Sequence, residues 1–141
     1  MANYMSATRT NYFHVTDAEK FMALMNRCVA EDEINIWSDT NANGKHTYAF
    51  GVEGTFDGLP GPEDDSEDPN EAMNRFIEEL QAVIRPDDAC IITNAGWEKL
   101  RYVGGNALII TRDKAFNLNL AECAARKTRE LLDDPAWEIQ T

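Results

Sequence analysis

The feature that most constrains this chain is one amphipathic stripe bounded by two prolines. Its apolar residues recur at helical spacing and predict a helix that Asp68 caps, Pro69 begins and Pro86 ends. Glu71, three residues after Asp68, completes a capping box. Such a helix buries one face against another layer of structure. The stripe consists of Met73, Phe76, Ile77, Leu80, Val83 and Ile84.

The segment before this helix predicts strands and a second helix. Residues 11–15 are rich in aromatic and β-branched types, which favours a short strand, and residues 1–10 are expected to be a flexible N-terminus. Thr16 and Glu19 have the spacing of a capping box, so we expect a helix that ends near Ala30.

A hairpin is predicted next, because residues 34–37 and 48–52 alternate between apolar and other side chains. Residues 41–44, with two asparagines and a glycine, favour the turn between them. The stretch that starts at Asp39 also fits the opening of a calcium-binding loop. The twelfth position of that loop requires a bidentate Glu and holds Phe50 here, so we favour the turn.

The C-terminal third predicts more strands and a last helix. Residues 89–93 form a short apolar strand, and residues 100–111 predict a hairpin whose tight turn is Gly104-Gly105. Asn119 and Glu122 then cap a helix. The order β-α-β-β-α-β predicts a ferredoxin-like α+β core with an added hairpin and a C-terminal helix, in one domain over residues 11–141.

The charge of the chain is strongly negative. Asp and Glu number 25 against 13 Lys and Arg, which gives −12. Direct nucleic-acid binding is disfavoured, because affinity for phosphates comes from clustered basic residues. A partner protein with a basic surface fits better, and the alternative is that the acids only aid solubility.

The three cysteines, Cys28, Cys90 and Cys123, are far apart and predict buried free thiols in a reducing compartment. No apolar run approaches membrane length, so we expect a cytoplasmic protein. We expect no cofactor and no dedicated metal site, because no nucleotide-binding, hydrolase or zinc-ligand spacing is present.

Acidic residues are concentrated in residues 57–71, where seven of fifteen are acidic and none is basic. Glycines and prolines in the same stretch predict an exposed loop. Weak association with a divalent ion is an alternative use of these carboxylates. The acidic partner-binding residues that we predict are Glu63, Asp64, Asp65, Glu67, Asp68 and Glu71, with Glu78 and Glu79 on the following helix.

A second candidate surface is the segment of residues 96–102. Trp, Tyr and Arg are enriched at binding hot spots, so Trp97, Arg101 and Tyr102 are predicted partner contacts. The alternative is an ordinary half-buried strand. A different class of function, a small enzyme or ligand-binding domain with a pocket on the sheet, would use His14, His46, Tyr48 and Glu98.

Three stretches of the chain, residues 8–13, residues 15–17 and residues 98–103, resemble small uncharacterised acidic proteins from phages and mobile elements of gut bacteria. The resemblance implies an accessory role in the conflict between mobile DNA and its host. Anti-CRISPR and anti-restriction proteins are similar in size and charge. The leading hypothesis is therefore a non-enzymatic inhibitor that blocks a basic surface of a nuclease or another nucleic-acid-binding effector. A purely structural homodimer is a further alternative.

Overall fold

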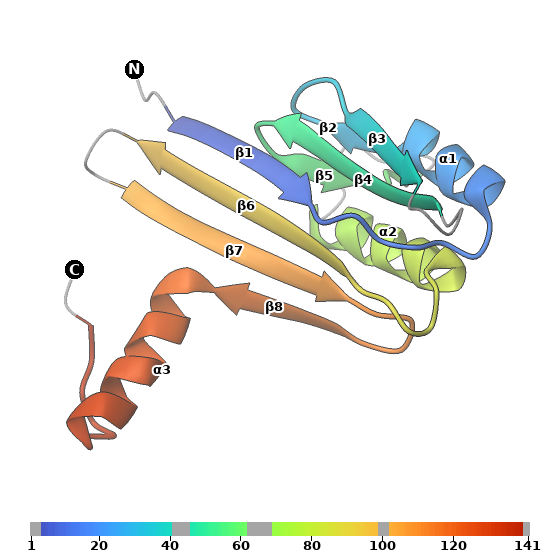
Figure 1. The fold of residues 1–141 in the computed structure, drawn as a ribbon. Coiled ribbons are helices and arrows are strands. Elements are labelled where there is room, and N and C mark those ends of the chain that lie inside the picture. The colour runs from blue at the N-terminus through green and yellow to red at the C-terminus, as the bar shows by residue number, and fades with distance from the viewer. Residues whose placement is uncertain (1–3, 41–45, 62–68, 99–101, 140–141) are drawn as a thin grey trace.

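A computed structural model describes residues 4–40, 46–61, 69–98 and 102–139. Six strands form one antiparallel sheet and two short strands form another, so the α+β prediction is confirmed (Figure 1). In chain order the elements are β1 (Tyr4–Thr10), α1 (Ala18–Arg27), β2 (Val29–Ala30), β3 (Asn35–Thr40), β4 (His46–Glu53), β5 (Phe56–Gly58), α2 (Pro69–Val83), β6 (Cys90–Glu98), β7 (Tyr102–Ile110), β8 (Ala115–Asn119) and α3 (Leu120–Leu132).

The N-terminal strand β1 lies in the middle of the large sheet, whose order is β3-β4-β1-β6-β7-β8. All seven residues of β1 pair with β6, and its other edge pairs with β4. The predicted position of the first strand, residues 11–15, is therefore wrong, and so is the flexible N-terminus from residue 4 onward. Residues 11–15 make only the isolated bridges of Phe13 and Val15.

Hydrogen bonds rather than apolar side chains hold β1 in place. Thr8 and Thr10 are 4% and 2% exposed. The Thr8 hydroxyl donates to the Gly54 carbonyl at 2.8 Å and accepts from Asn94 Nδ2 at 2.7 Å. The Thr10 hydroxyl accepts from the Phe50 N–H at 3.0 Å. These bonds satisfy the buried hydroxyls, and a search for hydrophobic periodicity does not detect a strand of this kind.

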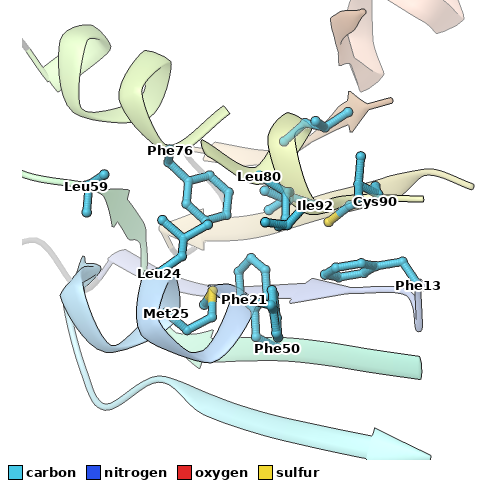
Figure 2. Close-up of a cluster of buried hydrophobic side chains, with 13 residues drawn as sticks. Phe13, Phe21, Leu24, Met25, Phe50, Leu59, Phe76, Leu80, Cys90 and Ile92 are labelled. Carbon is cyan, nitrogen blue, oxygen red and sulfur yellow. The ribbon is translucent and has the colours of Figure 1, made fainter. Parts of the chain in front are cut away.

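Helices α1 and α2 lie side by side against one face of the sheet (Figure 1). The predicted stripe of α2 is confirmed, since Phe76, Leu80, Val83 and Ile84 are at most 5% exposed and Met73 and Ile77 pack against them. Between helices and sheet lies the hydrophobic core (Figure 2), which consists of Phe13, Phe21, Leu24, Met25, Phe50, Leu59, Phe76, Leu80, Val83, Ile84, Cys90, Ile92 and Ile110.

Phenylalanine rings join the layers of this core. Phe76 of α2 meets Phe50 of β4 edge-on with ring centroids 5.9 Å apart, and Phe56 of β5 at 4.8 Å. Phe21 of α1 meets Phe13 at 5.6 Å in the same geometry. Edge-to-face pairs of this kind add to the stabilisation that burial of the rings provides.

The start and end of α1 differ from the sequence prediction. Asp17, not Thr16, is the N-cap, since its carboxylate accepts from the Lys20 N–H at 3.1 Å. The Thr16 hydroxyl instead donates to the Val83 carbonyl at 3.1 Å, which links the start of α1 to the end of α2. α1 ends at Arg27 rather than near Ala30, because the chain then forms β2 and pairs with β5.

The predicted turn at Gly104-Gly105 is wrong. Both glycines lie inside β7, where Gly104 pairs with Gly96 and Gly105 with Ala95 of β6. The connection between β6 and β7 falls at residues 99–101, outside the described residues. The glycine pair was misread because a turn and a strand that faces small neighbours both accept glycine.

The C-terminal helix begins as predicted, with the Asn119 side chain accepting from the Glu122 N–H at 3.1 Å. The strand β8 immediately before it was missed. α3 projects from the β8 edge of the sheet, and the following chain folds against it (Figure 1). Arg129 Nε donates to the Trp137 carbonyl at 2.7 Å. None of the described helices has the length and apolarity to cross a bilayer.

Truncation of one α2 core residue tests this packing. Leu80→Ala is expected to lower the free energy of unfolding by about 3 kcal/mol, because Leu80 is fully buried and its loss leaves a cavity. Leu131→Ala, at a position 76% exposed, should change the unfolding free energy by less than about 0.5 kcal/mol. Urea denaturation at one protein concentration measures both, and equal losses would contradict this core.

Candidate functional site

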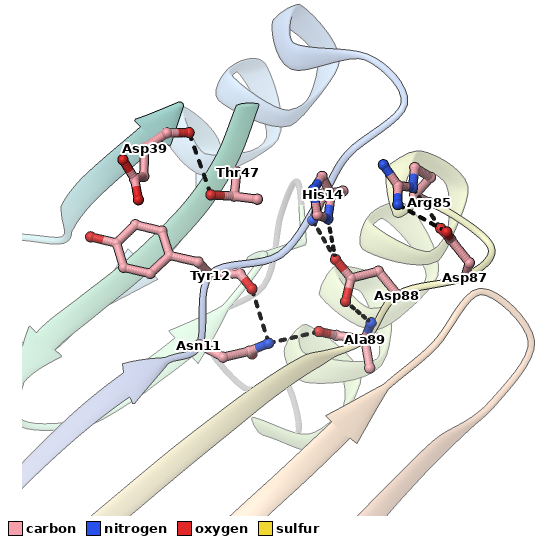
Figure 3. A network of polar contacts seen from close by, with 9 residues as sticks. All are labelled: Asn11, Tyr12, His14, Asp39, Thr47, Arg85, Asp87, Asp88 and Ala89. Carbon is pink, nitrogen blue, oxygen red and sulfur yellow. Dashed lines mark hydrogen bonds and ion pairs between the residues drawn. The ribbon is translucent and has the colours of Figure 1, made fainter. Parts of the chain in front are cut away.

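The densest group of polar contacts around a histidine joins the β1–α1 connection to the α2–β6 connection (Figure 3). His14 Nδ1 lies 2.7 Å from Asp88 Oδ2, and the same oxygen accepts from the His14 backbone N–H at 2.8 Å. Asn11 Nδ2 donates to the Ala89 carbonyl at 3.0 Å beside them. Arg85 and Asp87 form a more exposed pair nearby, joined by the Arg85 Nε and Nη2 atoms.

Asp88 is held in its ionised form by these contacts. Partial burial acts to raise the pKa of the Asp88 carboxyl, but hydrogen bonds from the His14 backbone, the His14 ring and the Ala89 N–H outweigh it. The pKa therefore lies below its usual value. With Nδ1–H donating to Asp88, the proton-accepting nitrogen of a neutral His14 ring is Nε2.

The His14–Asp88 pair has the composition of a catalytic base and its orienting carboxylate. However, His14 Nε2 is buried and has no hydrogen-bond partner. A substrate does not reach this nitrogen in the observed arrangement. The other three residues of the enzyme hypothesis do not converge on it. His46 and Tyr48 lie together on β4, 6.1 Å between ring centroids, and Glu98 pairs with Tyr4 at the far end of β6.

The cysteines are free thiols, as predicted, with Cys90 buried and the other two partly buried. Burial raises the pKa of Cys28 to about 12, although the neighbouring Arg27 opposes this and Glu79 adds to it. Burial also raises the pKa of Cys90, with a smaller contribution from Asp88. Both thiols are therefore poor nucleophiles. Within the described ranges, no three His, Cys, Asp or Glu residues form a metal-binding group.

One face of the large sheet is not covered by α1 and α2, and we call it the open face. The strand register places its residues in rows, such as Met5, Trp97 and Val103, or Ala7, Ala95 and Gly105. Its mainly apolar part consists of Met5, Ala7, Arg9, Trp37, Ala49, Gly51, Ile91, Thr93, Ala95, Trp97, Val103, Gly105, Ala107, Ile109, Phe116 and Leu118. Asn35, Asp39, Thr47 and Glu53 lie on the same face of β3 and β4.

The open face exposes large apolar side chains around a centre of small ones. Trp97 is 49% exposed and Val103 is 78% exposed. Ala7, Thr93 and Ala95 line a shallow hollow of about 520 Å³ between the larger side chains. An exposed apolar surface that spans several strands of a sheet usually marks an interaction site. The predicted partner contact Trp97 belongs to this surface.

The negative charge of the chain is concentrated in residues 28–74, which we call the acidic segment. It holds twelve carboxylates and one basic residue, Lys45, and so accounts for −11 of the net charge of −12. Folded, it supplies β2 to β5 and the first part of α2, on the β3 side of the sheet (Figure 1). The residues from 75 onward, including β7, β8 and α3, are close to balanced in charge.

Part of the acidic segment has a fixed geometry. The Glu31 carboxylate accepts from the Thr55 N–H at 3.0 Å, and the Thr55 hydroxyl lies 3.5 Å from an Asp57 oxygen. Gly54, at φ +101°, donates its N–H to the Ser6 carbonyl of β1 at 2.8 Å. A Cβ at Gly54 would lie 2.5 Å from the Glu31 carboxylate, so only glycine allows this close approach.

The structure describes only some of the residues that were predicted as acidic partner contacts. Glu71 and Glu78 are exposed and lie two turns apart on α2, with Arg75 between them donating to the Leu59 carbonyl at 3.0 Å. The side chain of Glu79 is paired with Arg27 of α1, which offsets its charge. The remaining predicted contacts, Glu63, Asp64, Asp65, Glu67, Asp68, Arg101 and the side chain of Tyr102, lie outside the described residues.

The predicted exposed loop of residues 57–71 is corrected at its start. Asp57 and Gly58 belong to β5, which pairs with β2. Leu59 follows and is only 4% exposed in the core. Gly58 has a φ of +94°, and a Cβ there would lie 2.7 Å from the Ala72 carbonyl oxygen, so this glycine lets the chain pass close to α2.

Sequence reasoning missed the open face. Its signal is the strict alternation of Ile91, Thr93, Ala95 and Trp97 with residues that point to the core. Recognising it requires a strand that continues to Glu98, whereas the sequence prediction ended the strand at residue 93. Gly96 lies inside this strand, where it faces Gly104 across the ladder and needs no side chain.

Replacement of Asp88 tests the role of the His14–Asp88 pair. Asp88→Asn is expected to lower the free energy of unfolding by about 2 kcal/mol at pH 7, because a carboxylate that accepts three hydrogen bonds becomes an amide. The folded-state pKa of Asp88 is depressed, so its contribution is present above the unfolded value of about 3.9 and lost as the pH falls below it. Denaturant titrations from pH 7 to pH 2 should therefore show the two proteins converge in acid.

The neighbouring Asp87→Asn is the matched control. Asp87 is an exposed carboxylate that pairs with Arg85, so its replacement should cost less stability than Asp88→Asn. Two outcomes would contradict this role of Asp88: equal losses from the two variants, or a difference between wild type and Asp88→Asn that persists unchanged at pH 2. Either would show that the partly buried hydrogen bonds of Asp88 do not stabilise the link between the two connections.

Comparisons with known proteins add no family to this description: no family model, no curated protein and no solved structure matches the chain. The molecule presents two candidate binding surfaces. One is the acidic segment with its fixed corner at Glu31, Thr55 and Asp57. The other is the apolar open face of the sheet.

Proposed function

We propose that this chain is a non-enzymatic binding protein whose acidic segment occupies a basic, nucleic-acid-binding surface of a partner protein. The observation that carries the proposal is the separation of charge, with −11 of −12 in residues 28–74. A field of one sign on one side of a protein steers it toward a surface of opposite sign. Complementary charge accelerates encounter and disfavours wrong partners.

The way in which the acids are held supports a role in contact rather than in solubility alone. A solubilising charge needs no defined position. Glu31 is fixed by Thr55, and the loop that carries Thr55 is tied to β1 through Gly54. Side chains that are already ordered lose less conformational entropy on binding, which favours affinity.

The class of partner follows from the charge and from the resemblance to small acidic proteins of phages and mobile elements. Carboxylates arrayed on one side of a small protein can take the place of phosphates in a groove lined by Lys and Arg. A bacterial nuclease that defends against mobile DNA carries such a groove. We therefore propose an anti-CRISPR or anti-restriction type of inhibitor that acts in the cytoplasm of the host cell.

We also propose that β1, α1, β3, β4, α2 and β6 form a ferredoxin-like unit. The support is the order β3-β4-β1-β6, in which every neighbouring pair is antiparallel. In this order each of the helices α1 and α2 connects two strands that a third strand separates, which is the split βαβ arrangement. β7 and β8 would then extend this unit at its β6 edge.

Binding to purified defence nucleases of a bacterial host, with and without their nucleic acid, tests the proposed function. We expect binding to a nuclease at about 50 mM salt, displacement of its DNA or RNA, and a much weaker affinity at about 300 mM salt, because exposed charges are screened. A triple variant, Glu31→Gln, Glu33→Gln and Asp57→Asn, should weaken this affinity by about 10-fold or more.

The matched control removes the same number of charges from the other side of the molecule. Glu122→Gln, Glu130→Gln and Asp134→Asn are exposed positions on α3 and just after it. This variant should keep the wild-type affinity to within about 2-fold. Absence of binding to every nuclease at low salt, or an equal loss in both triple variants, would overturn the proposal.

A further inference from the structure

We propose that the open face of the sheet binds a second copy of this chain, so that two six-stranded sheets pack face to face in a two-fold dimer. The starting observation is that α1 and α2 cover only the opposite face. On the open face, among the described elements, α3 reaches only the end formed by β7 and β8, where Leu120 and Cys123 border it. Stacked sheets of this kind pack about 10 Å apart through interdigitated side chains.

The distribution of charge identifies the occupant. On the open face of the three strands β1, β6 and β7, the described residues include no carboxylate, although Asp and Glu make up 25 of the 141 residues. The one charged group there is Arg9, whose guanidinium lies over the Trp37 ring, 4.5 Å from its centroid. Two copies with a charge of −12 each repel elsewhere, and this acid-free centre of the open face is where they can approach.

The same face also carries the charges that a copy of itself would complement. Asp39 lies on the open side of the edge strand β3, opposite Thr47, and Glu53 lies on the open side of the neighbouring strand β4, opposite Ala7. Arg9 lies on β1, the next strand inward from β4. A two-fold contact is self-complementary and needs only one patch that carries both signs around an apolar centre. A basic partner, in contrast, would be attracted to the acidic segment and not to a face whose centre carries Arg9.

The area of the open face is sufficient for a dimer. A residue on one face of a sheet covers about 32 Å², from about 6.7 Å along the strand and about 4.8 Å between strands, so the mainly apolar part of the open face spans roughly 500 Å². Two copies together bury about 1,000 Å² of flat area, which is the lower limit for a specific interface. Protruding side chains such as Trp97 and Val103 increase the accessible area above this flat value.

The mass of the protein in solution tests the inference. Light scattering and sedimentation at about 50 μM should give a mass twice that of the 15.9 kDa chain. Ala95→Glu places a carboxylate in the centre of the open face. Because the proposed dimer has two-fold symmetry, its interface would contain two of these carboxylates. We expect this variant to weaken the dimer by at least about 100-fold and to sediment as a monomer.

Ala23→Glu is the matched control, because Ala23 is an exposed position on α1, away from the open face. It adds the same charge and should stay dimeric, and circular dichroism should show both variants folded. Monomeric wild type, dimeric Ala95→Glu, or monomeric Ala23→Glu would each overturn the inference. Because binding to a nuclease is measured separately, a failure here leaves the proposed role of the acidic segment standing.

Discussion

The sheet holds together through β1. The hairpin of β3 and β4 and the three strands β6, β7 and β8 contact each other in the sheet only by way of this strand. β1 pairs over its full length with β6 and with the end of β4, and its buried threonine hydroxyls bond to Gly54, Asn94 and Phe50. A strand whose two edges are both paired contributes main-chain hydrogen bonds on two sides, so a sequence with few apolar residues can occupy the centre.

Two consequences follow from this arrangement. On one face of the sheet, Cys90 and Ile92 of β6 join α1 and α2 in a phenylalanine-rich core, beside the buried threonines of β1. The side chains of β1 and β6 that point to the other face belong to the open face. The acids are kept out of the core, because burial of a carboxylate without a partner is costly. They are concentrated in the acidic segment, whose described strands lie on the β3 side of the sheet, and a basic partner would meet the molecule there.

The His14–Asp88 pair links two connections of the same fold. It ties the chain leaving β1 to the chain entering β6, and Asn11 adds two bonds across the same gap, one to the Ala89 carbonyl and one from the Ile91 N–H. Both connections carry backbone groups that the sheet ladder no longer satisfies. Polar side chains at these positions therefore replace main-chain partners. This explains why His14 contacts Asp88 although the His14 Nε2 atom is buried and has no partner.

Local rules were enough for the elements that stabilise themselves. The stripe of α2, the Asn119 cap of α3 and the alternation of β3 and β4 depend on residues close in sequence, and the sequence alone identified them, together with the concentration of acids. The central place of β1, the continuation of β6 through Gly96, the strand β8 and hence the open face were decided by tertiary structure. Each depends on partners far along the chain, because a strand acquires its hydrogen bonds and its small-residue contacts only from its neighbours in the sheet.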